Sequence, residues 1–319
     1  MHVVTTIFRI WLGLLFLIGS PTVPVRAATP PPPPKRSDIE RVLAMARARG
    51  PERLAERPLQ VVLLADRKDH GADEHDYPRW QSRWALLLGG GAASSAPAAN
   101  LYGPDRPHSS LAQGSPQIRV ATAEQWPSAE QWKTADSIVA FCYVAWTPER
   151  ISQLGQYLDR GGGLVVIHSA TWTKPQASAD VAAVLGVGGF QNWRHGAVSL
   201  ETTQPEHPIC LGLPRVLPLV DESYWPPTPS IDATDVRVLA GSEEQNELAD
   251  RPAVSLQPMF WTYQRSQGRV FGCVPGHYSW TFDDPYFRLW LLRGIAWSAH
   301  ESPYRLDDLV LRSAAVRDE

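Results

Sequence analysis

The chain has 319 residues and a formal net charge of −3 at pH 7, with no block of basic residues that could follow a phosphate backbone. This composition argues against nucleic acid as a partner. The three cysteines allow at most one internal disulfide and form no CxxC pair, so the fold is expected to depend neither on a disulfide framework nor on a structural zinc site.

Residues 1–27 have the pattern of a secretory signal peptide, in which Arg9 precedes a short apolar core and "VRA" ends at Ala27. The apolar core is shorter than the ~20 residues that span a bilayer, and no later segment comes close. Cleavage near Ala27 would give a periplasmic or secreted protein without an integral membrane segment. The segment 28–57 is predicted to be a proline-rich tether, which cannot be helical, and a lead-in helix.

Short apolar runs alternate with amphipathic segments through the rest of the chain. The expected strands are 59–65, 118–122, 137–143, 164–168, 198–202, 236–240 and 269–274. The clearest helix lies between Thr147, a favourable N-cap, and Gly161, a stop signal. Strand, helix, strand in this order predicts a parallel sheet with right-handed crossovers. We expect one domain at 58–298, with a flexible Gly/Ser/Ala/Pro-rich insertion at 89–117 and a C-terminal tail at 299–319.

The stretch "DRKDHGADEHDYPRWQ" (66–81) directly follows the first predicted strand and is dense in ionisable residues. Such a connecting segment is ordinarily a solvated turn. In a parallel sheet, however, ligands bind beyond the carboxyl ends of the strands, where this loop leaves the sheet. The stretch is therefore predicted to be one wall of a site, to which His70, His75 and Tyr77 contribute.

Four further polar clusters occupy comparable places. His168 ends "GGGLVVIH", His195 lies in "NWRHG", Asp221 and Glu222 lie in "VDESYW", and His277 lies in "GCVPGHYSWTFDDPYFR". The predicted topology brings five histidines to one rim of the sheet, namely His70, His75, His168, His195 and His277.

The ordered set "DHGADEHDYPRWQ", "GGGLVVIH", "RHG", "EHPI", "DESYW", "GRVF" and "GHYSWTFDDPYFRLWLLRGIAW" resembles the trehalose-utilisation, or ThuA-like, family in its exported bacterial form. The resemblance covers residues 58–298. It implies the fold of class I glutamine amidotransferases, a flavodoxin-like three-layer α/β/α sandwich with a mostly parallel sheet, and a role in carbohydrate catabolism. The insertion at 89–117 departs from the family pattern.

The resemblance does not extend to glutamine amidotransfer. Those enzymes carry a cysteine nucleophile in the tight turn after a central strand, and the matching strand here ends in His168 and Ser169. Ser169 lacks the flanking glycines of a GxSxG turn, which argues against a serine hydrolase. Cys142 and Cys273 lie inside apolar strands and are expected to be inert core residues.

Three kinds of function remain open for histidines and carboxylates without a strong nucleophile. The first is proton transfer on a disaccharide or keto-sugar, trehalose-like in kind, by a hydrolase, lyase or isomerase. The second is metal-dependent hydrolysis, with zinc or another divalent ion as a possible cofactor. The third is a non-catalytic module that binds a small carbohydrate.

The residues that would serve these functions fall into three groups. The catalytic candidates are His75, His168, Asp221, Glu222 and His277. The substrate-binding candidates are His70, Tyr77, Arg194, His195, Tyr224, Trp225 and Trp280, because aromatic rings with polar handles suit a sugar ring. The possible metal ligands are His70, His75 and His168. Structural alternatives exist: Asp221 and Glu222 could pair with Arg194 or Arg293, and the aromatic residues could belong to the core.

Overall fold

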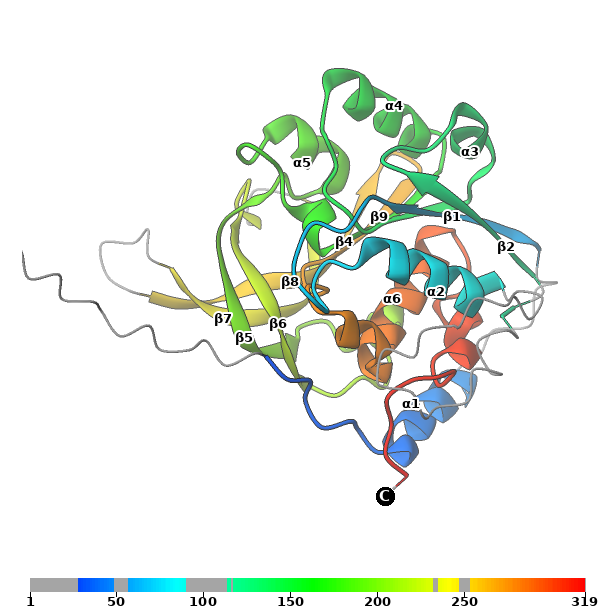
Figure 1. Ribbon diagram of the computed structural model, residues 1–319, viewed down its shortest axis with the longest axis vertical. Coiled ribbons are helices and arrows are strands. Elements are labelled where there is room, and N and C mark those ends of the chain that lie inside the picture. The colour runs from blue at the N-terminus through cyan, green and yellow to red at the C-terminus, as the bar shows by residue number, and fades with distance from the viewer. Residues whose placement is uncertain are drawn as a thin grey trace, which may run out of the picture.

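The computed structural model in Figure 1 describes residues 28–48, 57–89, 114–115, 117–231, 235–246 and 253–318. The predicted signal peptide and nearly all of the predicted insertion lie outside these residues. The α-helices are α1 (Arg36–Ala48), α2 (Tyr77–Gly89), α3 (Ala129–Thr134), α4 (Pro148–Asp159), α5 (Ala179–Leu185) and α6 (Pro285–Ser298). The 3-10 helices that bear on the site are η2 (His168–Thr171), η3 (Pro208–Cys210), η5 (Ser279–Asp283) and η6 (Pro303–Leu309).

In the described residues, nine strands form one sheet in the order β2-β1-β3-β4-β9-β8-β7-β5-β6. These strands are β1 (Leu59–Ala65), β2 (Ile118–Glu124), β3 (Ser137–Ala140), β4 (Gly163–Ile167), β5 (Phe190–Thr202), β6 (Val216–Pro227), β7 (Arg237–Asn246), β8 (Ala253–Arg265) and β9 (Gly268–Cys273). The predicted α/β class is confirmed. The predicted parallel arrangement is correct at one end only, where β2, β1, β3, β4 and β9 run parallel.

Strands β1, β3 and β4 of the parallel end are buried and apolar along almost their whole length, as expected where helices cover a sheet, whereas the edge strand β2 is partly exposed. Figure 1 shows α3, α4 and α5 beside one face of these strands and α2 and α6 beside the other. Trp80, Trp84 and Leu88 form the buried, apolar face of α2. The predicted N-cap of α4 is correct, since the Thr147 side chain caps this helix, and Asp284 caps α6.

The other end of the sheet is antiparallel and was not expected. Strands β6 and β8 escaped prediction, and the "NWRHG" and "VDESYW" segments lie within β5 and β6 rather than in loops. The physical reason is that β6 is buried along Asp221–Trp225 with polar side chains facing the site, so it lacks the apolar alternation that marks a half-buried strand. Strand β9 then returns the chain to the parallel end beside β4.

The cysteines that were expected to be core residues, Cys142 and Cys273, are buried in the core. Cys142, Cys210 and Cys273 are free and buried, and burial raises the pKa of the Cys142 thiol to about 12, so these thiols are unreactive near neutral pH. Residues 28–34 contain no helix, as their prolines require. No helix among the described residues is long and apolar enough to cross a membrane.

Candidate functional site

Four side chains from distant parts of the chain meet beyond the carboxyl ends of β1, β4 and β9. His75 comes from the loop after β1, His168 from the start of η2, His277 from the loop after β9, and Glu222 from the antiparallel strand β6. One ligand atom from each lies within 4.8 Å of those of the other three, and all four residues are buried. We call His75, His168, Glu222 and His277 the histidine centre.

His168 is at the middle of the centre. Its Nε2 lies 2.9 Å from Nε2 of His75 and 3.1 Å from Oε2 of Glu222. Nδ1 of His277 lies 2.9 Å from the same carboxylate oxygen. The hydroxyl of Tyr224 lies 2.9 Å from Nε2 of His168 and 3.2 Å from Oε2 of Glu222, so it closes the buried side of the centre.

The backbone forms the centre at the point where β4 ends. His168 has a φ of 51°, in the left-handed region that residues other than glycine rarely adopt. This conformation turns the chain sharply from β4 into η2 and places the imidazole at the edge of the sheet. Gly276, with a φ of 139°, allows the β9 loop to pass closely, since a Cβ there would lie 3.2 Å from Cβ of His168. Strain of this kind concentrates at functional sites.

The contacts of Nδ1 in His168 and in His75 indicate which ring nitrogen carries the proton. Nδ1 of His168 lies 2.7 Å from the carbonyl oxygen of Val274, and Nδ1 of His75 lies 3.0 Å from Oδ1 of Asp69. A carbonyl and a carboxylate only accept, and the Tyr77 hydroxyl, 2.8 Å from Nδ1 of His75, donates to Oδ2 of Asp69, so we assign the proton to Nδ1 in both rings. Each Nε2 then presents a lone pair to the other across 2.9 Å, with the Glu222 carboxylate beside them. Such an arrangement requires a positive charge, either a proton on one Nε2 or a metal ion.

Burial decides against a protonated His75 as the source of that charge. Burial, reinforced by His168 and His277 nearby, holds the pKa of His75 far below its ordinary value. Burial alone would raise the pKa of Glu222, but the close contacts with His168 and His277 and the charge of these imidazoles outweigh it and keep that pKa well below its usual range. The centre thus contains a fixed carboxylate beside at least one neutral imidazole.

His277 is buried, yet neither of its ring nitrogens makes an aligned hydrogen bond. Nδ1 lies close to Glu222, but outside hydrogen-bonding geometry, and Nε2 is 3.7 Å from Oε1 of Glu74. Burial lowers the pKa of His277, but the contact with Glu222 more than offsets this and leaves the pKa above its ordinary value. A buried imidazole without a partner is rare in proteins and indicates a missing one.

The donor set fits a divalent metal ion. Imidazole nitrogen and carboxylate oxygen are ordinary zinc ligands, and Zn–N bonds of ~2.0–2.1 Å in a tetrahedron place neighbouring ligand atoms about 3.3 Å apart. The spacings of 2.9 to 3.1 Å around His168 and Glu222 are close to that value. Outer partners such as Asp69 and the Val274 carbonyl are what metal-binding histidines require.

The chain also matches a protein family model. The family described as trehalose utilisation, ThuA, matches residues 108–298, more than half of the chain. The chain belongs to the ThuA family. No curated protein matches it.

Two solved structures share the fold of this ThuA protein. A protein described as ThuA-like from Bacteroides uniformis superimposes with a TM-score of 0.56 at 19% identity, over 80% of this chain and 99% of that one. A second, from Parabacteroides merdae, has a TM-score of 0.50 at 17% identity, over 77% of this chain and 92% of that one. At these identities the likeness shows the fold alone.

The amidotransferase-like turn of the ThuA protein holds an imidazole instead of a thiol. His168 occupies the strained position after β4. Ser169, the next residue, is fully buried, and its hydroxyl makes no hydrogen bond with the described part of the chain. It therefore cannot act as an exposed nucleophile.

Of the possible metal ligands, His75 and His168 belong to the centre, and His70 lies beside it, with Nδ1 2.8 Å from Oδ1 of Asp69. Asp69, His70 and His75 form a second group whose ligand atoms lie close enough to hold an ion. The ring centroid of His70 is 3.8 Å from that of His75, and its side chain is 37% exposed. Nε2 of His195 is 3.4 Å from Oε1 of Glu222, and its side chain is 40% exposed. These two partly exposed imidazoles line the open side of the centre.

Other predicted site residues serve the structure around the centre. Both Asp221 oxygens are used, because its carboxylate accepts from the backbone N–H groups of Glu222, Gly276 and His277 and from the Thr281 hydroxyl. We assign Asp221 a positioning role in place of the catalytic one. Tyr77 is buried and contacts His75 and Asp69 rather than an open surface.

The predicted pairing of Asp221 and Glu222 with Arg194 or Arg293 is wrong. Arg194 binds Glu244 through two nitrogens at 2.6 and 2.9 Å, and Arg293 binds Asp307. Trp225 is mostly buried and donates to the carbonyl of Gln245, which places it on the far face of β6. Trp280 stacks on Tyr278 at 4.2 Å and donates to the carbonyl of Val220.

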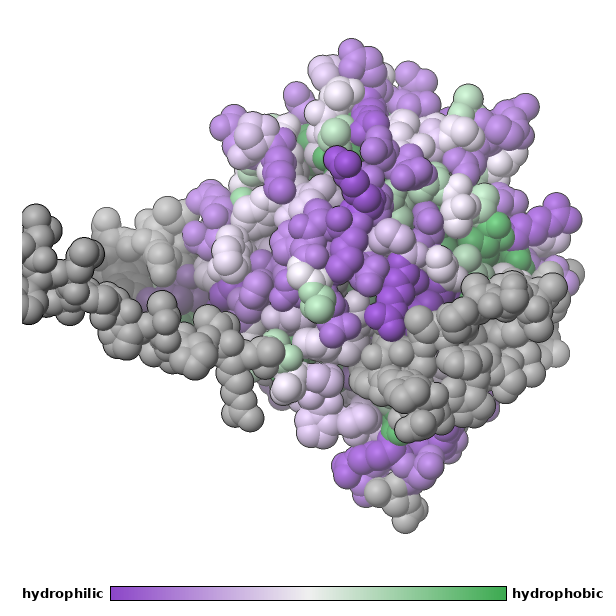
Figure 2. All heavy atoms as spheres, in the orientation of Figure 1, coloured by the Kyte–Doolittle hydropathy of each residue, from purple (hydrophilic) through white to green (hydrophobic). Residues whose placement is uncertain are grey.

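Two residues near the centre, Asp69 and Glu74, were not singled out from the sequence, whereas Trp193 was one of the aromatic residues that could stack on a sugar ring or belong to the core. Asp69 joins the outer nitrogens of His70 and His75, Glu74 faces His277, and Trp193 lies beside His195. Asp69 and Glu74 lie within the 66–76 stretch. This stretch contains so many carboxylates that the sequence alone does not indicate which of them contact the histidines. Figure 2 shows that hydrophilic residues cover the middle of the face where this loop lies in Figure 1.

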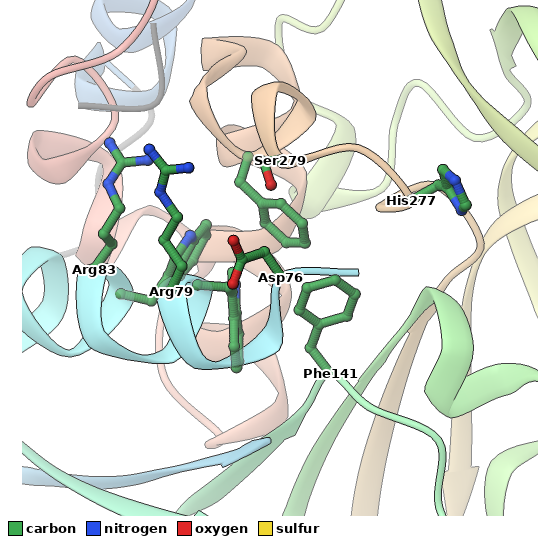
Figure 3. Close-up of a pocket in the computed structure, with 9 residues that line it drawn as sticks. Asp76, Arg79, Arg83, Phe141, His277 and Ser279 are labelled. Atoms are coloured by element: carbon green, nitrogen blue, oxygen red, sulfur yellow. The ribbon is translucent and has the colours of Figure 1, made fainter. Parts of the chain in front are cut away.

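A small cavity beside His277 lies on the closed side of the site. Its lining residues are Asp76, Arg79, Trp80, Arg83, Trp84, Phe141, His277, Ser279 and Phe282. Its volume is about 10 Å³, room for one water. In Figure 3, His277 stands apart from Arg79, Arg83 and Asp76. The cavity is too small to hold a sugar ring.

Proposed function

We propose that this ThuA protein is a divalent-metal-dependent enzyme of carbohydrate catabolism, exported from the cytoplasm, that acts as a hydrolase or lyase on a disaccharide or its keto form. One observation carries the proposal: Nε2 of His75 and Nε2 of His168 face each other at 2.9 Å with their outer nitrogens protonated. Zinc or a similar ion between them would supply the positive charge. When bound, such an ion polarises a carbonyl group and lowers the pKa of water.

The protein residues then have distinct tasks. The ion would be held by His75, His168, His277 and Glu222. The negative charge of Glu222 would balance part of the positive charge of the ion. Asp69 and the Val274 carbonyl keep the two imidazoles in the tautomer that binds metal. His70 and His195, on the open side, contact the centre and are within reach of a substrate.

The sugar class rests on the family description and on the surroundings of the centre. The family is described as trehalose utilisation, and the aromatic residues Trp193, Tyr278 and Trp280 lie close to His195 or to one another. Aromatic faces beside polar groups suit a sugar ring. The amidotransferase-like, three-layer architecture is part of the same proposal, because it places the loops after β1, β4 and β9 at one edge of the sheet.

A metal-free enzyme that works by proton transfer is the second candidate. It is favoured by the direct contact of Glu222 with His168 and His277, which resembles the carboxylate and imidazole pairs of general acid and base catalysis. In this reading a proton on one Nε2 makes the 2.9 Å contact an N–H···N hydrogen bond, but the buried His277 still has no aligned hydrogen bond within the described part of the chain, and for that reason we place it second.

Turnover assays on metal-depleted and reconstituted protein test the proposal. Trehalose, other disaccharides and their 3-keto forms serve as substrates, with zinc, manganese or cobalt restored one at a time. We expect activity to depend on the ion and to be lost in Glu222→Gln, while Glu243→Gln, an exposed glutamate on β7, keeps it. Full turnover by the depleted protein would favour proton transfer alone, and tight sugar binding with no turnover would favour a binding module.

A further inference from the structure

Trp193 is unusual among the exposed side chains. It is 57% exposed, and it is the one aromatic residue among the large exposed hydrophobics of the described residues, which are Met45, Trp193, Val216, Val254 and Leu256. A tryptophan exposed to this extent leaves a large apolar face in water, where it gains nothing for the fold.

The strand places Trp193 on the face of β5 that looks toward the histidine centre. Side chains alternate along β5, so Trp193 and His195 share one face and Arg194 points to the other. The Arg194 face packs on β7 through Glu244. Across the ladder, Trp193 is opposite Tyr224 and His195 is opposite Glu222, both of which belong to or border the centre.

Ring contacts connect Trp193 to the metal ligands in two steps. The ring of Trp193 lies 5.2 Å from that of His195, and the ring of His195 lies 4.4 Å from that of His277. Trp193 is therefore one side chain removed from the centre, on its open side. A group bound at the centre and extending past His195 would next meet the Trp193 face.

We propose that Trp193 is the platform of a second sugar-ring subsite, which stacks on the apolar face of one pyranose ring while the neighbouring ring lies over the histidine centre. The inference rests on the proposed function and deepens it, because it assigns the enzyme a substrate of two or more linked rings. Stacking requires no particular hydroxyl pattern, so Trp193 sets the length of the substrate rather than the identity of its sugar.

Calorimetric titration of the zinc-loaded protein tests the subsite, with trehalose and maltose as two-ring probes and methyl α-glucoside as the one-ring probe. Trp193→Ala should weaken binding of the two-ring sugars roughly tenfold, the order of one aromatic contact, and leave methyl α-glucoside unchanged. Where a sugar is turned over, KM should rise with kcat unaltered. Trp193→Phe should restore most of the affinity.

Met45→Ala, which removes an exposed hydrophobic side chain from α1, is the matched control and should bind all three probes as the wild type does. Equal affinities of wild type and Trp193→Ala for the disaccharides, or no binding of any probe by the zinc-loaded wild type, would overturn the subsite. So would a loss of self-association in Trp193→Ala, seen by sedimentation, without a change in sugar affinity. Sugar binding that needs Trp193 but proceeds without zinc would contradict the metal proposal alone.

Discussion

At the scale of single residues, His168 connects the backbone turn after β4 to the chemistry of the centre. Its imidazole is fully buried, with one nitrogen held by Val274 and the other facing His75. His168→Ala should lower turnover by ~10²–10⁴-fold, the usual contribution of a catalytic group, and should also abolish stoichiometric metal binding. Activity per folded molecule and metal content are the measurements, and a variant with unchanged activity but ~1–3 kcal/mol less stability would show a purely structural histidine.

Asp69 should control metal affinity without binding the metal itself. Its Oδ1 accepts from His75 at 3.0 Å and from His70 at 2.8 Å, while its side chain is 34% exposed. Asp69→Asn removes the charge that holds the His75 tautomer, so zinc affinity should fall ~10–100-fold with little loss of stability. Competition with a chelator measures this affinity. Asp73→Asn, in the same loop and 56% exposed, is the control, and equal affinities in the two variants would contradict the role.

The sequence located the four residues of the centre but not their bonding. Motifs at the ends of predicted strands led to His75, His168 and His277, because the carboxyl ends of parallel strands share an edge, and the polar cluster "VDESYW" led to Glu222. The hydrogen bond from His168 to the carbonyl of Val274 joins positions 106 residues apart, and a backbone acceptor has no side-chain signature. Likewise, nothing in "NWRHG" distinguishes the exposed Trp193 from a core tryptophan.

At the scale of elements, a buried carboxylate joins α2 to α6. Asp283, at the end of η5, accepts from Arg83 of α2 at 3.0 and 3.2 Å and also binds Arg288 of α6. Asp283→Asn leaves two buried guanidinium groups without their counter-charge and should destabilise the protein by about 3–5 kcal/mol. Urea unfolding measures the loss. Asp308→Asn, whose partner Arg47 is exposed, should change stability by less than ~0.5 kcal/mol, and similar losses in the two variants would be the contrary result.

The turn at η3 should add a pH dependence that is separate from the centre. Burial, helped by Arg237, lowers the pKa of His207 from 6.5 to about 4, and its Nδ1 accepts from the backbone N–H of Ile209. A folded pKa below the unfolded one stabilises the protein above pH 6.5, and this stability is lost as the pH falls toward 4. Between pH 7.5 and 5 the loss should be about 2 kcal/mol.

His207→Gln removes this titration, so its stability should fall less with acid than that of the wild type. Unfolding in chelator at each pH keeps metal binding out of the comparison. Parallel pH profiles of the two proteins would show that His207 does not carry the effect.

The sequence predicted the helices and strands whose apolar residues recur with a regular period. It did not predict the strand that presents polar residues to the site. The apolar faces of α2 and α4 follow helical spacing, and β1, β3 and β4 read as buried strands. In contrast, β6 presents Glu222 and Tyr224 to the centre on one face and Trp225 to β7 on the other, so neither face shows a simple pattern. Strand β6 was not predicted because the polar residues that face the site interrupt the apolar pattern of a strand.

At the scale of the whole molecule, the sheet joins two parts with different tasks. The parallel end supplies His75, His168 and His277 from loops at one edge, and the antiparallel end brings Glu222 and His195 across to them. Figure 1 shows β5 and β6 beside the loop that follows β1. The carboxylate of the centre thus depends on strands outside the parallel scaffold, so local opening of this end would remove one ligand while leaving the three histidines in place.

X-ray absorption spectroscopy of zinc-loaded protein after gel filtration shows whether the histidine centre binds a metal ion. We expect one zinc ion per chain, with nitrogen and oxygen ligands at ~2.0–2.1 Å and the scattering pattern of three imidazoles. Both the stoichiometry and the imidazole pattern should be lost in His168→Ala and kept in Glu243→Gln. A folded wild-type protein that retains no zinc, or one that binds zinc equally well without His168, would contradict the metal centre.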